Sequence, residues 1–315
     1  MEFEKYHKVK RLGGDENKLI FSDHNDEIVI QEKIDGGNFR FYIQDDKVIF
    51  GSRTRELDET QEHVKNFRRC IEFVRSKLKG KDLSDYNGLI FYGECCVKHT
   101  ISYDWDKIPP FLGFDIKGII SLSWEKDKKY GYLPYDVTKE YFEELDLPMV
   151  PTIKVCKASE IDVPITDDSV PISEYALESS QDKKAEGIVF KNYDKQIFAK
   201  YVRDAFKEKN SKVFGGSPKY NKVDDTNNAE FIFKYVTNYR IEKIILKKLD
   251  DGNSLTMELM GELIRDVYLD VIEEEWREIL TSNWKLDFKK LRRICAPRVR
   301  AVLEQMIENN YINQI

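Results

Sequence analysis

Hydrophobic positions in the first two thirds of the chain alternate over short runs, which is the pattern of half-buried β-strands. In residues 38–43 the side chains of Phe39, Phe41 and Ile43 fall on one face. A turn of two aspartates separates this run from residues 47–53, so the two runs predict a β-hairpin. Further strands are predicted at residues 27–33, 88–94, 109–116, 186–191 and 196–202.

Two segments of the same region have helical spacing instead. In residues 59–79 apolar side chains recur every third or fourth position, and Gly80 ends the pattern. A shorter helix is predicted at residues 137–145. This part of the chain therefore mixes helices and strands.

After residue 227 only helical periods are found. The pattern predicts helices at residues 229–249, at residues 254–280 behind an N-cap at Ser254, and from about Asp287 onward. Pro297 is expected to kink the last helix or to begin a fourth. Residues 216–226 are rich in Gly, Pro, Asn and Asp and predict a linker. The fold class is therefore α+β, with antiparallel sheets and flanking helices in residues 1–215 and a small all-helical domain in residues 227–315.

Composition narrows the class of protein. The chain has 315 residues, 41% of them hydrophobic, and a net charge of −6, which excludes a disordered chain and a uniformly basic nucleic-acid binder. Five cysteines without a C-x-x-C pair and four scattered histidines, among them His99, give no zinc signature and favour an intracellular, cytoplasmic setting. Cys95, Cys96 and His99 are expected to be structural. No apolar run is long enough for a membrane span.

The stretch that carries candidate chemistry is Lys33-Ile34-Asp35-Gly36-Gly37, where a hydrophobic strand runs into two glycines. The strand fixes the stem of Lys33, and the glycines allow the backbone to approach a bulky ligand. A lysine becomes a nucleophile only when its amine loses a proton, and its usual pKa is about 10.4. Apolar surroundings or neighbouring cations, including a metal, would have to lower that pKa. A surface lysine before a turn is the alternative interpretation.

Charged and aromatic residues recur at or near the ends of the other predicted strands. They are Arg53, Glu94, Phe114, Asp115, Glu186, Lys191 and Lys200. A nucleoside triphosphate with a divalent metal would satisfy both signs of charge, because lysines and arginine bind phosphates while carboxylates bind the metal and ribose. Glu186 and Lys191 are five residues apart, so they share a site only if the strand twists, bulges or ends between them.

In this order and spacing the set resembles the covalent nucleotidyltransferase superfamily of polynucleotide ligases and RNA-capping guanylyltransferases. Lys33-Ile34-Asp35-Gly36 is similar to motif I, Phe91-Tyr92-Gly93-Glu94 to motif III, Phe114 to the aromatic residue of motif IIIa, Glu186 to Lys191 to motif IV, and Lys200 to motif V. Motif V of the family usually has a second lysine, where this chain has Val202 beside Arg203, so only Lys200 is carried over.

Within the superfamily the chain most resembles the RNA ligase 2 family. Glu32 and Asn38 flank motif I as they do there, residues 206–209 read Phe-Lys-Glu-Lys, and residues 234–240 resemble the start of that family's helical C-terminal domain. DNA ligases and capping enzymes carry an OB-fold instead, which would need several short strands after residue 227.

The resemblance implies an ATP-dependent RNA ligase that uses Mg²⁺ or Mn²⁺, joins 3′-OH and 5′-phosphate RNA ends and repairs strand breaks. Lys33 would be the catalytic residue that carries AMP. Glu186 and Glu94 would bind the metal. ATP or AMP would be bound by Glu32, Ile34, Asn38, Arg53, Glu94, Phe114, Glu186, Val189, Lys191 and Lys200.

Residues 284–300 contain seven Lys or Arg against one Asp, and this cluster can neutralise RNA phosphates. Lys289, Arg292 and Arg293 are the RNA-contact candidates there, and the resemblance adds Arg240. A solvated helix face is the alternative. The expected partner is RNA, as a nicked duplex or as free ends, and the protein is expected to be a monomer without membrane association.

Two alternatives stay open at this point. One is another covalent nucleotidyltransferase, either an ATP-dependent DNA ligase or a GTP-using capping guanylyltransferase. The other is a catalytically inactive RNA-binding scaffold that retains the fold. The presence of Lys33, Glu94 and Glu186 argues against the scaffold, because a protein that only binds RNA has no need of a nucleophile.

Overall fold

In the computed structural model the chain divides after Arg203 into two units, residues 1–203 and 204–315. The structure describes residues 4–45, 47–58, 64–96, 103–120, 129–203, 226–281 and 285–308. Several predicted features lie outside them: residues 59–63 of the first helix, His63, His99, residues 206–209, and the linker at 216–226 except Thr226. The predicted linker therefore stays a prediction.

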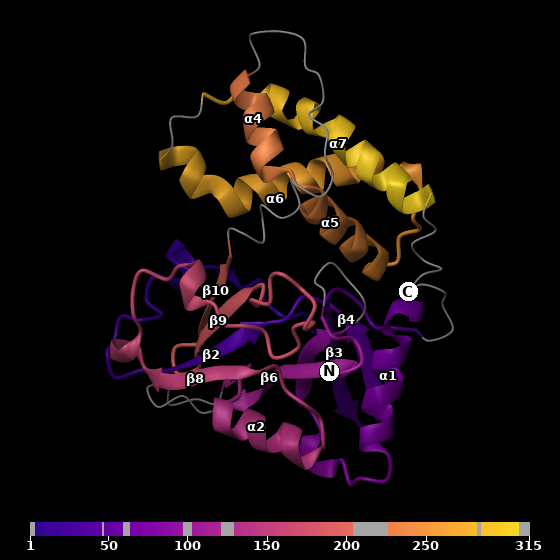
Figure 1. Ribbon diagram of the computed structural model, residues 1–315. Coiled ribbons are helices and arrows are strands. Elements are labelled where there is room, and N and C mark those ends of the chain that lie inside the picture. The colour runs from indigo at the N-terminus through magenta and orange to yellow at the C-terminus, as the bar shows by residue number, and fades with distance from the viewer. Residues whose placement is uncertain are drawn as a thin grey trace. The chain divides into compact units, whose positions relative to one another are not determined.

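Five strands form sheet A in unit 1, in the order β1-β10-β9-β2-β8, and Figure 1 shows β8, β2, β9 and β10 following one another. The strands are β1 (Lys10–Arg11), β2 (Glu27–Lys33), β8 (Thr152–Lys157), β9 (Gly187–Asn192) and β10 (Ile197–Val202). All pairs are antiparallel except β1 with β10. The strands β2, β9 and β10 were predicted, whereas the pattern did not indicate β1 or β8.

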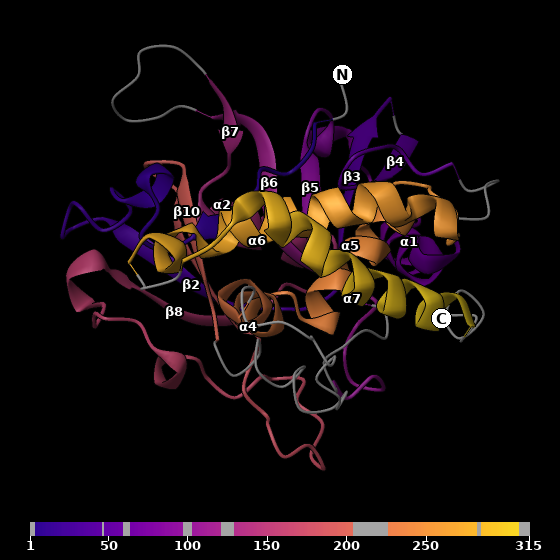
Figure 2. The ribbon, with the colours of Figure 1, turned by 90° about the horizontal axis from the view of Figure 1, so that it is seen from above.

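Sheet B is entirely antiparallel and has the order β4-β3-β5-β6-β7, which can be followed across Figure 2. Its strands are β3 (Gly37–Gln44), β4 (Lys47–Ser52), β5 (Ile90–Cys95), β6 (Phe111–Ile120) and β7 (Lys129–Tyr132). The predicted hairpin is confirmed, since β3 pairs with β4 from Phe39 opposite Ser52 to Gln44 opposite Lys47. The mixed α+β class with antiparallel sheets is also confirmed.

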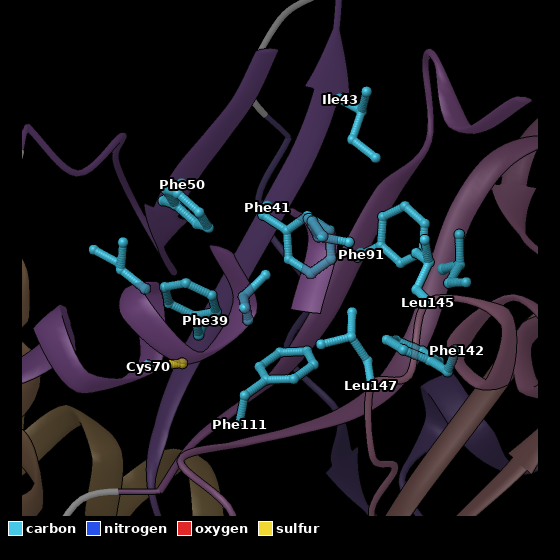
Figure 3. Packing of buried hydrophobic residues seen from close by; sticks show 14 of the residues in the cluster. Phe39, Phe41, Ile43, Phe50, Cys70, Phe91, Phe111, Phe142, Leu145 and Leu147 are labelled. Atoms are coloured by element: carbon cyan, nitrogen blue, oxygen red, sulfur yellow. The ribbon is translucent and has the colours of Figure 1, made fainter. Parts of the chain in front are cut away.

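The largest core of unit 1 lies on the outer face of sheet B. Helices α1 (Lys65–Leu78) and α2 (Tyr135–Glu144) cover this face. Phe39 and Phe41 point into this core, as their alternation predicts, and the rings of Phe41 and Phe91 stack 4.7 Å apart (Figure 3). Apolar side chains of α1 and α2 pack on the same side, so this face is closed to solvent and to ligand.

The opposite face of sheet B meets sheet A through a second, aromatic cluster. Val29 and Phe198 come from sheet A, and Tyr42, Tyr92 and Tyr132 come from sheet B. The hydroxyl groups of these tyrosines bring polarity into the space between the sheets. The two inner faces therefore bring together side chains that are far apart in the sequence.

Every described secondary-structure element of unit 2 is a helix. Its helices are α4 (Thr226–Tyr235), α5 (Asn238–Asp250), α6 (Met260–Thr281) and α7 (Phe288–Glu308), and they bury one apolar cluster around Leu263, Val267 and Leu303. No described helix of either unit is both long and apolar enough to cross a membrane.

Three details of the predicted helices were wrong. The helix expected at residues 229–249 is two helices, because Thr237 caps a new one by accepting a hydrogen bond from the backbone N–H of Arg240. Ser254 is not the N-cap of α6, which begins at Met260 after a single 3₁₀ turn, Met257–Leu259. Pro297 starts no fourth helix, since α7 continues through it. Other 3₁₀ turns are Asp15–Asn17, Ser84–Tyr86, Ala158–Glu160 and Asp167–Ser169.

Candidate active site

The candidate nucleophile is the last residue of β2. Lys33 Nζ donates a hydrogen bond to Glu186 Oε2 across 2.7 Å, with 18% of the lysine side chain and 3% of the carboxylate side chain exposed. Lys33 lies opposite Gly187, the first residue of β9, so Glu186 stands just outside the strand. Glu186 and Lys191 can therefore belong to one site despite their five-residue spacing, because β9 begins only after Glu186.

The turn after Lys33 packs directly on sheet B. A Cβ atom on Gly36 would lie 2.5 Å from the carbonyl oxygen of Cys95 and 2.9 Å from Cγ of Glu94, which only glycine allows. The backbone N–H of Asp35 donates to the hydroxyl of the buried Tyr103 across 3.0 Å. Lys33 of sheet A and Glu94 of sheet B are thus held at two sides of one turn.

Lys33 shares one face of sheet A with the other predicted lysines. The register sets Lys33, Gly187 and Val202 in one row, Gln31, Val189 and Lys200 in the next, and Val29, Lys191 and Phe198 in the third. Directly opposed residues in antiparallel strands point to the same face, so Lys33, Lys200 and Lys191 point toward sheet B. Val202, where the family usually has its second motif V lysine, lies in the row of Lys33.

Lys191 is more deeply buried than either of the other two lysines. Its Nζ donates to Asp115 Oδ2 and to the carbonyl oxygen of Phe114, each across 2.8 Å. Asp115 also accepts hydrogen bonds from the hydroxyls of Tyr6, across 2.7 Å, and Tyr193, across 2.6 Å. We call Tyr6, Asp115, Lys191 and Tyr193 the Asp115 centre. Both described bonds of the Lys191 amine go to protein oxygens, and its phosphate role stays a prediction.

Burial sets the protonation of the groups around this centre. It raises the pKa of Tyr6 and Tyr193 well above the usual value, with the charge of Asp115 adding to the effect, so both hydroxyls remain donors at neutral pH. Burial also lowers the pKa of Lys191, and Asp115 opposes that shift. The nearby His7 has its pKa lowered to about 4, mainly by burial, with Arg53 among the neighbouring positive charges.

Three predicted adenosine contacts lie on sheet B or just beyond Lys33. Ile34 is buried with Tyr103 and Leu112, and Phe114 packs against that cluster as well as the aromatic cluster between the sheets. Asn38 lies opposite Glu94 in the pairing of β3 and β5. Its Oδ1 is buried and has no hydrogen-bond partner among the residues that the structure describes. A buried oxygen of this kind fits a polar contact to a ligand.

Glu32 lies on the other side of sheet A from Lys33, because neighbouring strand residues alternate. It accepts hydrogen bonds from the hydroxyl of Ser173 and from the backbone N–H of Glu174, the latter across 3.2 Å. Burial raises the pKa of its carboxyl group. Glu32 thus ties β2 to the loop before β9, and its adenosine contact stays a prediction.

Glu186 and Glu94 are the two predicted metal ligands, and the structure describes more contacts for Glu186. A Mg²⁺ ion is usually held by one or two carboxylates together with substrate phosphates and water, and a carboxylate that already attracts a cation fits that set. No group of three or more metal-ligating side chains is gathered anywhere in the described ranges. Glu186 and Glu94 stay the predicted metal ligands.

With this geometry, comparison with known proteins identifies the family. The family model described as RNA ligase matches residues 26–209, more than half of the chain. The chain belongs to the RNA ligase family. No curated protein matches the sequence of this RNA ligase family member.

Solved structures with a similar fold include Naegleria gruberi RNA ligase with PPi (TM-score 0.48, 21% identity, 66% of this chain and 58% of that chain). A mutant of the same ligase with AMP and Mn gives a TM-score of 0.47 at 20% identity, over 66% of this chain and 59% of that chain. A putative ATP-dependent DNA ligase from Aquifex aeolicus gives 0.44 at 18% identity, over 88% and 68%. This RNA ligase family member thus spans under two thirds of the length of the Naegleria chains.

The remaining predicted positions of this RNA ligase family member have distinct surroundings. Arg203 is buried, and its guanidinium donates to the carbonyl oxygens of Ala185 and Lys184 and to Asp182. The side chain of Arg203, next to the Val202 position where the family usually has its second motif V lysine, is therefore bonded to its own loop. Arg53 follows β4 and is half-buried, and Cys95 and Cys96 are buried and free, as expected of structural cysteines.

The RNA-contact candidates in unit 2 fall into two kinds. Lys289, Arg292 and Arg293 are exposed on α7. Arg240 is mostly buried and forms ion pairs with Glu275, across 2.6 Å, and Asp270, across 3.4 Å. Arg240 thus joins α5 to α6, and its contact with RNA stays a prediction.

Sequence reasoning missed several residues that shape the site. Tyr103, Ser173, Tyr6 and Tyr193 contact Asp35, Glu32 or Asp115 from distant parts of the chain, and no local pattern marks them. Asp115 carried a signal, because it is an acidic residue inside an otherwise apolar strand.

Proposed function

We propose that this member of the RNA ligase family is an ATP-dependent RNA ligase that works through a lysyl-AMP intermediate and repairs RNA strand breaks. The observation that carries the proposal is the 2.7 Å contact between Lys33 Nζ and Glu186 Oε2 at the end of β2. The amine is partly exposed, fixed by a strand, and backed by a carboxylate that can accept its proton or bind a cation.

The chemistry proceeds in three steps. Lys33 Nζ attacks the α-phosphorus of ATP, the bond to pyrophosphate breaks, and the proton on the amine leaves, with Glu186 Oε2 placed to accept it. The AMP passes from the lysine to a 5′-phosphate on RNA, and the lysine is regenerated. A 3′-OH then attacks that phosphate, a phosphodiester bond forms, and AMP leaves.

Other residues bind and orient the reactants. Lys200 points to the same face of the sheet as Lys33, one row away, and would hold the phosphates. Asn38, Ile34, Val189 and Phe114 would contact adenosine. A divalent cation held by Glu186 and Glu94 would neutralise charge on the triphosphate when bound. These side chains pre-position the amine and phosphorus, which is the main requirement of phosphoryl transfer.

Unit 2 supports an RNA ligase 2-type enzyme over a DNA ligase or capping enzyme. Every described element after Thr226 is a helix, whereas an OB-fold would require strands there. The exposed cations Lys289, Arg292 and Arg293 on α7 are available to RNA phosphates. Their role as an RNA contact is part of the proposal.

Incubation with α-labelled ATP or GTP and Mg²⁺ tests the donor, and sealing of matched nicked duplexes tests the acceptor. We expect label from ATP only, and sealing when RNA supplies the 3′-OH side of the nick. Label from GTP would identify a capping-type enzyme. Equal sealing of all-DNA nicks would identify a DNA ligase, and no label from either nucleotide would favour an RNA-binding scaffold.

A further inference from the structure

In the Asp115 centre, protein groups alone compensate the buried charges of Lys191 and Asp115, so neither charge needs a ligand. Asp115 accepts from two tyrosine hydroxyls and from Lys191, and its side chain is 0% exposed. The rings of Phe114 and Phe198 lie 5.3 and 5.7 Å from Lys191 Nζ, whose side chain is 3% exposed. A buried ammonium needs such compensation, and a phosphate could reach it only by breaking these contacts.

The second acceptor of Lys191 has an unusual position in sheet B. The pairing of β5 with β6 shifts there, from Tyr92 opposite Asp115 to Gly93 opposite Gly113, so Phe114 is the extra residue of a β-bulge. The extra residue of a bulge is left without ladder partners, and its side chain is re-aimed. Lys191 Nζ donates to the carbonyl oxygen of this residue.

The ring of Phe114 connects this bulge to the nucleophile. It contacts Tyr6 edge to face, with ring centroids 4.9 Å apart. It also packs on the buried cluster that contains Ile34, the residue after Lys33. The direction of this ring depends on the backbone at the bulge, which Lys191 holds from sheet A.

We propose that Lys191 is a positioning residue that fixes the bulged Phe114 as a platform for the nucleotide base, and that it does not bind the triphosphate. This inference rests on the proposed function, because it assumes that Phe114 contacts the base. The three lysines of the inner face then have separate roles, since Lys33 reacts, Lys200 binds phosphate, and Lys191 sets base selectivity.

A double-mutant cycle tests the assignment, with the rate of AMP-adduct formation as the measurement. We expect Lys191→Met to slow adduct formation about 10- to 100-fold, as misplacement of a bound substrate does. Phe114→Leu should cause a similar loss, and the double variant should be no slower than the slower single variant. Lys191→Met combined with Lys200→Met should instead multiply the two losses.

The dependence of the rate on the base of the donor is an independent measurement, and a general loss of stability would not change it. Ribose 5′-triphosphate, which has no base, should lose little by Lys191→Met, so the preference for ATP over this probe should fall. Equal losses with both donors, or effects of Lys191→Met and Phe114→Leu that multiply, would overturn the inference.

Because Lys191→Met can disturb folding, Tyr193→Phe serves as a second variant that retains the ion pair. It should lower the ATP preference in the same direction by a smaller factor, and an unchanged preference would count against the inference. Wild-type protein that forms no adduct with ATP would refute the proposed function itself, so the two failures are distinguishable.

Discussion

Two lysines of sheet A pair with carboxylates in nearly the same geometry but with different access to water. Lys33 and Glu186 are 2.7 Å apart at the end of β2, and 18% of the lysine side chain is exposed. Lys191 and Asp115 are 2.8 Å apart between the sheets, where neither side chain is exposed by more than 3%. The first pair is partly open to solvent, whereas the second is enclosed by protein donors.

The comparison shows that two lysine–carboxylate ion pairs can have different roles. Asp115 accepts further hydrogen bonds from Tyr6 and Tyr193, and removing either Lys191 or Asp115 would leave the other buried charge uncompensated. Lys33 stands at the end of β2, and 18% of its side chain is exposed. A reactive amine requires the open arrangement, and a fixed scaffold requires the closed one.

The largest expected effect on activity comes from removing Lys33, the lysine of the more exposed pair. Lys33→Ala should abolish the covalent AMP adduct, because no other amine would be in line with the α-phosphorus. Intact-protein mass after incubation with ATP and Mg²⁺ measures the adduct. Lys47→Ala, which removes an exposed lysine at the β3–β4 turn, is the control and should still form it. An adduct on the Lys33→Ala protein would mean that the nucleophile is misassigned.

The closed pair should show its effect in stability. Asp115→Asn removes the counter-charge of a buried ammonium, which typically costs about 3–5 kcal/mol. Urea unfolding of the full chain, followed by tryptophan fluorescence or circular dichroism, measures the change. Asp194→Asn at the exposed β9–β10 turn should leave stability within about 0.5 kcal/mol. Equal stability of the two variants would contradict the contrast drawn between the pairs.

Removing the carboxylate of the open pair should affect activity more than stability. Glu186→Gln keeps the size of the side chain and removes its charge, so we expect adduct formation to fall about 10- to 100-fold. The Mg²⁺ concentration for half-maximal rate should rise, since a metal ligand is weakened. Titration of the rate with Mg²⁺ measures both, and Glu174→Gln, at an exposed carboxylate, is the matched control. An unchanged Mg²⁺ dependence would separate Glu186 from the metal.

The smallest effect is expected from a single hydroxyl of the Asp115 centre. Tyr193→Phe removes one of the hydrogen bonds to Asp115, and loss of a bond to a charged group costs about 1.5 kcal/mol or somewhat more. Tyr135→Phe, which removes a more exposed bond to Thr152, should cost less. The comparison uses the same urea titration. Were the two variants equally stable, burial would not be what distinguishes the centre.

Local sequence patterns predicted most of the features that lie within a single helix or strand. The alternation of Phe39 and Phe41 fixed the inner and outer faces of β3, and the run before Gly36 placed Lys33 at a strand end. The resemblance to a nucleotidyltransferase then grouped Lys33 with Glu186, and the structure places these two in contact. Such features depend on neighbours in the sequence or on motif order.

Features that depend on contacts between distant segments were not predictable. The break between α4 and α5 comes from a single cap at Thr237 inside an apolar stripe that continues across it. The burial of Lys191 depends on Tyr6 from the N-terminal segment and on a register shift beside Phe114. Neither spacing nor residue type distinguishes Lys191 from Lys200, although only one of them is enclosed.

Val202 lies in the same row as Lys33, on the other side of Gly187, and this position has a consequence for how the protein would depend on its surroundings. An apolar side chain stands where relatives usually place a permanent cation, so more of the neutralisation of a bound triphosphate must come from dissolved ions. Under the proposed activity, the rate of joining would then depend more steeply on the concentration of free magnesium.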